Sequence, residues 1–196
     1  SPEMVEQKTK TRLEAKYDDD IAPRLMEKFA LSNTHQLPKL SKIVINVGIG
    51  RHLENQKLKQ DITDTVISTL TQISGQKPIL RMAKKSVANF KVREGAPSGF
   101  MVTLRRDRMW HFLDRLMNLA MPRVRDFRGV KGSAFDKDGN YSVGLTEQAV
   151  WPEINMAQVT FVHGMNINVC FERSNPAMSR FLLEELGMPF ERPDED

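Results

Sequence analysis

The sequence predicts an α+β fold, in which an antiparallel sheet carries helices packed on one face and extended basic loops join the elements. Segments whose apolar residues recur at helical spacing are interspersed with short β-branched or alternating runs. The connections between these segments are irregular, and no internal repeat interrupts the series. With 196 residues, 40% of them hydrophobic and 28% charged, the chain is long enough to bury a core in one soluble domain.

The first helix is predicted over residues 11–31. Three consecutive aspartates at 18–20 and Pro23 interrupt its pattern, and Pro23 would fit the first turn of a helix that starts at Asp20. The segment therefore forms either one helix or two pieces. Its apolar residues recur at steps of four, at Leu13, Tyr17, Ile21, Leu25 and Phe29.

A strand is predicted next, over residues 39–47, because residues 43–45 are all β-branched. A second helix is predicted over residues 53–73, where apolar residues again share one face. Gly75 is expected to stop this helix, with Pro78 just beyond it.

Two short strands at 79–81 and 90–93 are expected to flank a loop. A further strand is predicted over residues 99–106, where side chains alternate in character. Asp107 is then interpreted as the N-cap of a helix over residues 108–120.

The last third of the chain begins with residues 123–140, which are rich in glycine and charge and show no helical period. This segment is predicted to be an extended loop. Strands are predicted over residues 141–146 and 165–171, and a final helix over residues 175–186 is expected to end at Gly187.

The net charge of +4 hides a strong asymmetry along the chain. Residues 77–131 carry 14 basic and 4 acidic side chains, whereas residues 132–196 carry 4 basic and 11 acidic ones. A polyanionic partner for the middle of the chain is the economical explanation. The acidic end is interpreted as an aid to solubility, with a basic partner as the alternative.

The strongest local signal is a basic stretch over residues 75–95, bounded by two glycines. Its cations would neutralise phosphates, and the lone aromatic residue Phe90 would offer a flat face on which a base can stack. The alternative is a solvated basic loop between two strands, with Phe90 in the core. The cations of this stretch are Lys77, Arg81, Lys84, Lys85, Lys91 and Arg93.

Two further groups of arginines are candidate RNA contacts. One stands at the predicted strand-to-helix junction, where guanidinium groups and helix-start amides can both face phosphate. The other lies in residues 122–129, where cations alternate with apolar residues and therefore share one face of an extended segment. Ordinary surface charge is the alternative for both. The candidates are Arg105, Arg106 and Arg108 in the first group and Arg123, Arg125 and Arg128 in the second.

Other chemistries find little support. The sequence Gly48-Ile49-Gly50 follows a strand, but Leu53 stands where a dinucleotide fingerprint needs its third glycine. Four scattered histidines and one cysteine, Cys170, give no metal-ligand spacing. We therefore predict no enzyme activity, no metal and no cofactor.

The single cysteine also fits a reducing, cytoplasmic compartment, because it cannot form an internal disulfide. A membrane span needs about 18 consecutive apolar residues, and every apolar run in the sequence is much shorter. The N-terminal residues show no apolar signal core. No membrane partner is therefore expected.

A series of motifs in fixed order resembles the bacterial large-subunit ribosomal protein five family. The series runs from about residue 13 to residue 190. Its members are PKLSKIVINVGIG at 38–50, GQKP at 75–78, AKKSVA at 83–88, VTLR at 102–105, PRVRDFRG at 122–129, SAFD at 133–136, GNY at 139–141, WPEI at 151–154 and GMPF at 187–190.

The resemblance implies a structural protein of the central protuberance that binds 5S rRNA and helps attach it to the large subunit. The family's 5S-contacting positions fall on Asn46, Gln76, Phe90 and Thr103 of this chain. Amides and a hydroxyl suit hydrogen bonds to sugars, phosphates and base edges, and Phe90 would supply the stacking face.

The resemblance also implies contacts with 23S rRNA, with the P-site tRNA and with a small-subunit protein across an intersubunit bridge. The tRNA-contacting loop falls on residues 81–89, with Arg81, Lys84, Lys85 and Ser86 as its candidates. The bridge contact is placed loosely in residues 128–140. An extra-ribosomal RNA chaperone or regulator with the same fold is the alternative function.

Three departures from the family pattern stand out. Asn89 replaces the usual glycine before Phe90, and asparagine tolerates positive φ better than most residues. The interval between Gly50 and Gln76 is about four residues longer than in common members, which should extend the second helix or the loop before it. Residues 1–10 and 191–196 are expected to be mobile extensions of one RNA-binding domain over residues 11–190.

Overall fold

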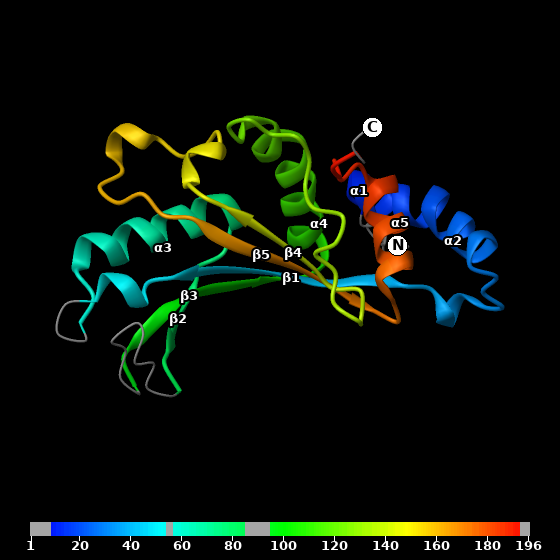
Figure 1. The fold of residues 1–196 in the computed structure, drawn as a ribbon, viewed down its shortest axis with the longest axis horizontal. Coiled ribbons are helices and arrows are strands. Elements are labelled where there is room, and N and C mark those ends of the chain that lie inside the picture. The colour runs from blue at the N-terminus through cyan, green and yellow to red at the C-terminus, as the bar shows by residue number, and fades with distance from the viewer. Residues whose placement is uncertain (1–8, 54–56, 85–94, 193–196) are drawn as a thin grey trace, which may run out of the picture.

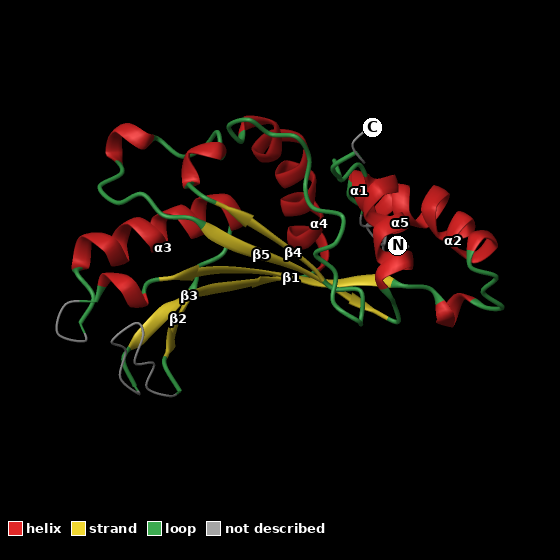
Figure 2. Ribbon diagram, in the orientation of Figure 1, coloured by secondary structure: helices red, strands yellow, loops and turns green. Residues whose placement is uncertain are grey.

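The computed structural model describes residues 9–53, 57–84 and 95–192. Five strands in this part of the chain form one antiparallel sheet in the order β2-β3-β1-β5-β4 (Figure 2). The strands are β1 (Lys39–Gly48), β2 (Ile79–Met82), β3 (Pro97–Leu104), β4 (Tyr141–Leu145) and β5 (Met165–Glu172).

Helices pack against one side of this sheet. Figure 1 shows α3 (Gln60–Ser74) and α4 (Arg106–Arg115) above the strands, while α1 (Arg12–Lys16), α2 (Ala22–Lys28) and α5 (Pro176–Leu186) group together near one end. The sheet therefore has a helix-covered face and, in the described residues, a face without helices. The predicted α+β fold with an antiparallel sheet is confirmed.

Alternation along the central strands explains how the sheet acquires two different faces. Side chains of successive strand residues point to opposite sides. In β1, β3 and β5 every second residue is buried, and these residues form the floor of the core beneath the helices. They are Ile43, Ile45, Val47, Phe100, Val102, Leu104, Ile167, Val169 and Phe171.

The predicted first helix is present as one nearly continuous segment. A π-helical turn, Tyr17–Ile21, joins α1 to α2 where the sequence suggested a possible break. Pro23 lies just after this π-helical turn, so its missing amide hydrogen falls beside an irregularity of the helix and not at a free helix end. Gly75 ends α3 with a left-handed φ of 74°, as predicted.

Two predicted boundaries are wrong. The second helix begins at Gln60, with Lys59 as its N-cap, instead of at residue 53, and a separate 3-10 turn at Gly50–His52 precedes it. Asp107 is not the N-cap of α4, since Arg105 holds that position and Arg106 turns the chain with a φ of 56°. Asp107 instead lies in the first helical turn, where a carboxylate is favoured by the helix dipole.

The remaining elements follow the prediction closely. β3 spans Pro97–Leu104, where residues 99–106 were expected, and the predicted strand at 90–93 lies outside the described residues. Residues 123–140 form an extended connection whose only strand-like pairs, in the described chain, are two isolated bridges. None of the helices in the described part of the chain combines the length and the apolar character that a membrane span requires.

Candidate nucleic-acid interface

The helix-free side of the sheet presents amides, hydroxyls and cations, together with the apolar side chains of Val44, Ile79 and Met101. We call this surface the open face. The strand register places Asn46 opposite Met101 on one side and Asn166 on the other, and Val44 opposite Thr103 and Asn168. The open face comprises Lys42, Val44, Asn46, Ile79, Arg81, Met101, Thr103, Ser142, Asn166, Asn168 and Cys170.

Two predicted contact residues, Asn46 and Thr103, are thus diagonal neighbours on adjacent strands. Side chains in this relation lie about 7–8 Å apart, within reach of one bound nucleotide. Both side chains are half-buried, so their polar groups remain accessible while the strands hold their backbones rigidly. The sheet register thus brings two residues of the predicted 5S-binding set onto one surface.

Gln76 joins this pair from the turn after α3. Its Nε2 donates a hydrogen bond of 3.1 Å to the backbone carbonyl of Thr103. Its Oε1 accepts a hydrogen bond of 3.1 Å from Nη1 of Arg108. Gln76 therefore connects the open face to the arginines at the start of α4.

Cations lie on the β2 and β3 side of the open face. Arg81 is exposed on the open face, and its Nη1 lies 3.9 Å from the sulfur of Met101. Lys84, Arg105 and Arg106 are exposed at the ends of β2 and β3. The arrangement can neutralise a phosphate backbone around a surface that donates and accepts hydrogen bonds.

Several open-face residues were missed by the sequence prediction. Asn166 and Asn168 alternate with buried residues along β5, and Ser142 Oγ donates a hydrogen bond of 2.7 Å to Asn168 Oδ1. The alternation of polar residues through residues 166–170 was the available signal. This alternation indicates neither the order of the strands nor that Asn166 lies beside Asn46.

Part of the predicted site lies outside the described residues. This part includes the candidate stacking residue and most of the candidate tRNA loop, together with the position where the chain departs from the family pattern. These residues are Lys85, Ser86, Asn89, Phe90, Lys91 and Arg93.

A second group of predicted residues forms a separate surface. We call residues 123–140 the arginine loop. Arg123, Arg125 and Arg128 are exposed on it, and Arg123 donates to the backbone carbonyl of Ala149 over 3.4 Å. In Figure 1 this yellow-green loop passes beside α5, away from the β2 and β3 end of the sheet.

Comparison with known proteins identifies the family. The family model "Ribosomal protein L5" matches residues 33–93, and the model for the C-terminus of the same ribosomal family matches residues 97–190. The chain is 48% identical to "Large ribosomal subunit protein uL5" of Desulfatibacillum aliphaticivorans over 180 residues, covering 92% of this chain and 98% of that protein. The chain belongs to the uL5 family.

Other uL5 relatives match equally broadly. The protein of Brevibacillus brevis is 49% identical over 182 residues, or 93% of this chain and 99% of the relative. That of Microcystis aeruginosa is 46% identical over 179 residues, or 91% and 98%. Proteins of the uL5 family are structural, non-enzymatic components of the large ribosomal subunit. The predicted family and the predicted absence of enzyme activity are therefore confirmed.

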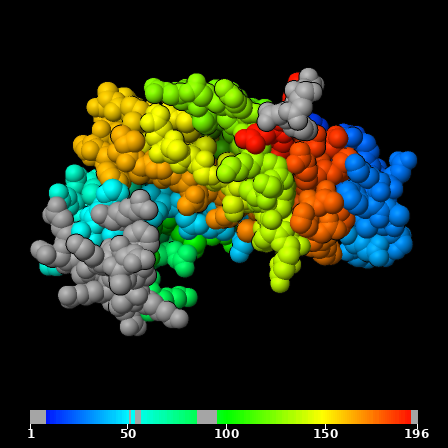
Figure 3. Space-filling view, in the orientation of Figure 1, coloured from blue at the N-terminus to red at the C-terminus, as the bar shows by residue number. Residues whose placement is uncertain are grey.

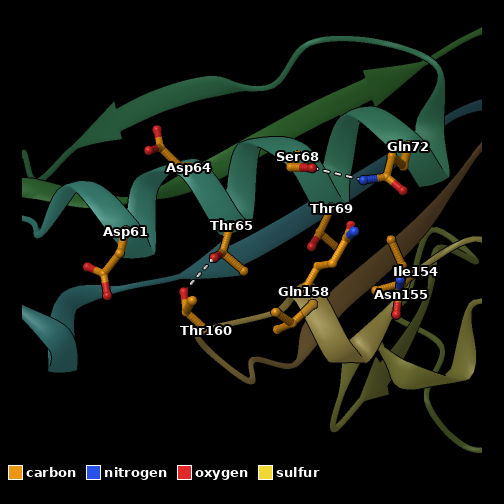
Figure 4. Close-up of a pocket in the computed structure, with 11 residues that line it drawn as sticks. Asp61, Asp64, Thr65, Ser68, Thr69, Gln72, Ile154, Asn155, Gln158 and Thr160 are labelled. Carbon is orange, nitrogen blue, oxygen red and sulfur yellow. Dashed lines mark hydrogen bonds between the residues drawn. The ribbon is translucent and has the colours of Figure 1, made fainter.

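This uL5-family chain also has a polar groove on its helical side. Figure 4 shows Asp61, Thr65 and Thr69 of α3 pointing toward the segment that carries Gln158 and Thr160. Thr65 and Thr160 are linked through their hydroxyls at 3.2 Å. The groove is lined by carboxylates, hydroxyls and amides without a lysine or arginine, so it does not suit phosphate.

Among the described residues, no three His, Cys, Asp or Glu side chains are placed to hold a metal ion. His52 and His163, which the sequence suggested were unrelated, both contact the ring of Phe161, with centroids 4.7 and 5.9 Å away. Burial raises the pKa of the Cys170 thiol, although nearby Lys42 opposes the shift.

Proposed function

We propose that the chain binds 5S rRNA through the open face and thereby helps to attach this RNA to the central protuberance of the large subunit. The observation that carries the proposal is that Asn46 and Thr103 share one helix-free surface of the sheet and that Gln76 hydrogen-bonds the backbone of Thr103. Cations border this surface, and hydrogen-bonding side chains cover its centre.

The chemistry of the open face suits irregular or single-stranded RNA. Amide groups donate and accept hydrogen bonds, so they can pair with base edges and 2′-hydroxyls, while Arg81 and Arg105 neutralise phosphates. Phe90 is proposed to stack on a base beside them. Rigid strands would hold the polar groups in place before RNA arrives, which reduces the entropy cost of binding.

The other partners are assigned to the arginine loop and to the segment after β2. Arg128 is shared by the 23S rRNA and bridge assignments, and Arg81 of the tRNA segment also lies on the open face. The arginine loop is proposed to contact 23S rRNA through Arg123, Arg125 and Arg128. Residues 81–89 are proposed to contact the P-site tRNA through Arg81, Lys84, Lys85 and Ser86. A small-subunit protein is proposed to meet residues 128–140 at an intersubunit bridge.

Salt-dependent binding tests the main proposal. Purified chain is titrated onto a 5S rRNA transcript at several salt concentrations, and affinity is expected to fall linearly with salt on a double logarithmic scale because phosphate contacts release counterions. Asn46→Ala should weaken binding, while Gln72→Ala in the polar groove should not. Equal loss with both variants, or binding insensitive to salt, would contradict the proposal.

A further inference from the structure

The arginine loop lacks regular secondary structure, yet the C-terminal segment fastens it to the fold. We call residues 188–191 the C-terminal strap. The amide of Val130 donates to the carbonyl of Pro189, and the amide of Glu191 donates to the carbonyl of Val130, both over 2.8 Å. These two bonds form a short parallel bridge between Val130 and Phe190.

Aromatic packing strengthens this attachment. The ring of Phe190 lies 6.1 Å from that of Phe135 and 5.6 Å from that of Tyr141. Tyr141 donates its hydroxyl hydrogen to the carbonyl of Lys131 over 2.6 Å, and burial raises its pKa to about 12, so it stays a donor at physiological pH. The strap residue Phe190 therefore contacts the loop on both sides of Lys131.

Arg180 of α5 adds a third attachment. Its guanidinium lies over the ring of Phe190 at 4.7 Å, and its Nη1 donates to the carbonyl of Gly132 over 3.3 Å. One arginine thus holds the loop and the strap to the same helix. In Figure 3 the yellow-green atoms of the loop lie against the orange atoms of α5.

Gly129 permits the close approach of the two segments. Its φ is 111°, and a Cβ atom at this position would lie 2.6 Å from the amide nitrogen of Glu191. An L-residue would be strained by this φ and would also push the strap away. The glycine lies directly after Arg128, so the strap contact fixes the backbone at the exposed cation.

The loop has opposite characters on its two sides. Val130 and the carbonyls of Lys131 and Gly132 face the strap, Tyr141 and Arg180, whereas Arg125 and Arg128 remain exposed. Neither arginine has an acidic partner among the described ion pairs. The fixed contacts therefore hold the backbone of the loop and leave the guanidinium groups available.

We infer that the C-terminal strap is a positioning element for RNA binding: Phe190, with Arg180 and Gly129, holds the arginine loop so that Arg125 and Arg128 meet RNA phosphates in a fixed geometry. This inference rests on the proposed function of the loop. Phe190 acts through the arginines and does not itself contact RNA. It favours binding because cations held in place beforehand lose less conformational entropy when RNA binds.

The test compares Phe190→Ala with Phe161→Ala, which removes an equivalent ring that packs on His52 and His163 instead of the loop. Full-length chains are titrated onto 23S and 5S rRNA transcripts at one salt concentration. Phe190→Ala should lower affinity for the 23S transcript by about threefold to tenfold and leave the 5S affinity within about twofold. Phe161→Ala should change neither affinity.

A double-mutant cycle shows whether the strap works through the arginines. In an Arg125→Ala/Arg128→Ala background, Phe190→Ala should cause little further loss, since the groups that it positions are absent. Hydrogen exchange at the amide of Val130 should accelerate in Phe190→Ala. Phe190→Tyr should restore both the affinity and the protection of this amide.

Separate outcomes identify what fails. If the Arg125→Ala/Arg128→Ala chain binds the 23S transcript as tightly as the parent, the proposed function of the loop is wrong. If those arginines matter but Phe190→Ala binds normally, or if its effect is fully additive with theirs, the strap inference is overturned. Should Phe190→Ala not fold, Gly129→Ala repeats the test from the loop side and must give the same selective loss.

Discussion

Gln76 Nε2 donates a hydrogen bond of 3.1 Å to the carbonyl of Thr103, which links the end of a helix to the open face of the sheet. The same side chain accepts from Arg108 through its other amide atom. A glutamine in this position holds two elements together and also borders the proposed RNA surface. Its structural and binding roles can be separated by measuring stability and affinity on the same variants.

Gln76→Ala should lower the free energy of unfolding by about 1 kcal/mol, the usual net worth of a hydrogen bond. It should also reduce 5S rRNA affinity by about threefold to tenfold. Gln76→Glu keeps an acceptor for Arg108 but loses the donor to Thr103 and adds a negative charge, so it should bind RNA more weakly still. Urea unfolding and RNA titration measure the two effects, and normal RNA affinity in both variants would remove Gln76 from the interface.

Asn166 and Asn168 extend the predicted surface onto β5. Replacing both with alanine should weaken 5S rRNA binding by about 1–3 kcal/mol, because the RNA loses hydrogen-bonding partners on a rigid surface. Asp64→Asn/Gln72→Ala, in the polar groove, is the matched control and should bind RNA normally. If only the groove variant loses affinity, the RNA surface lies on the helical side instead.

Gly48 and Gly99 face each other across β1 and β3, yet they should respond differently to alanine. A Cβ on Gly99 would lie 2.6 Å from the carbonyl oxygen of Val47, whereas one on Gly48 would meet nothing within 4 Å. Gly99→Ala should therefore destabilise the protein by about 1–3 kcal/mol. Gly48→Ala should be neutral or slightly stabilising. Equal thermal unfolding midpoints for the two variants would contradict the prediction that only Gly99 lacks room for a Cβ atom.

His163 should make stability fall on mild acidification. Burial lowers the pKa of His163, while Nδ1–H donates to the carbonyl of Gly164 over 2.9 Å. Below an unfolded pKa of about 6.5 the unfolded chain binds a proton that the folded chain does not, so stability drops by up to about 1.4 kcal/mol per pH unit until the folded pKa is reached.

Urea midpoints of the parent and of His163→Gln between pH 7.5 and 5 measure this contribution. The midpoint of the parent should decrease more steeply than that of the variant as pH falls below about 6.5. His35→Gln, at an exposed histidine in the 3-10 turn Thr34–Gln36, is the control and should follow the parent. Parallel curves for the parent and His163→Gln would show that His163 titrates alike in both states.

The elements that local signals define were predicted well. β-branched residues define β1, and the αL glycines Gly75 and Gly187 end α3 and α5 where expected. The start of α3 and the N-cap of α4 were missed. At the start of α4 the chain takes a left-handed φ of 56° at Arg106, directly after the N-cap residue Arg105. Residues other than glycine rarely adopt a positive φ, so no local sequence pattern predicts one at Arg106.

The sequence by itself determined the fold class, the concentration of cations in the middle of the chain and the order of motifs that identifies the family. These are properties of residue types and their spacing, which need no partner to be visible. Only the tertiary structure decided which polar residues share the open face, because strand order β2-β3-β1-β5-β4 brings together residues more than 100 positions apart, such as Asn46 and Asn166. It also decided that the C-terminal strap holds the arginine loop, since that contact depends on packing between distant segments.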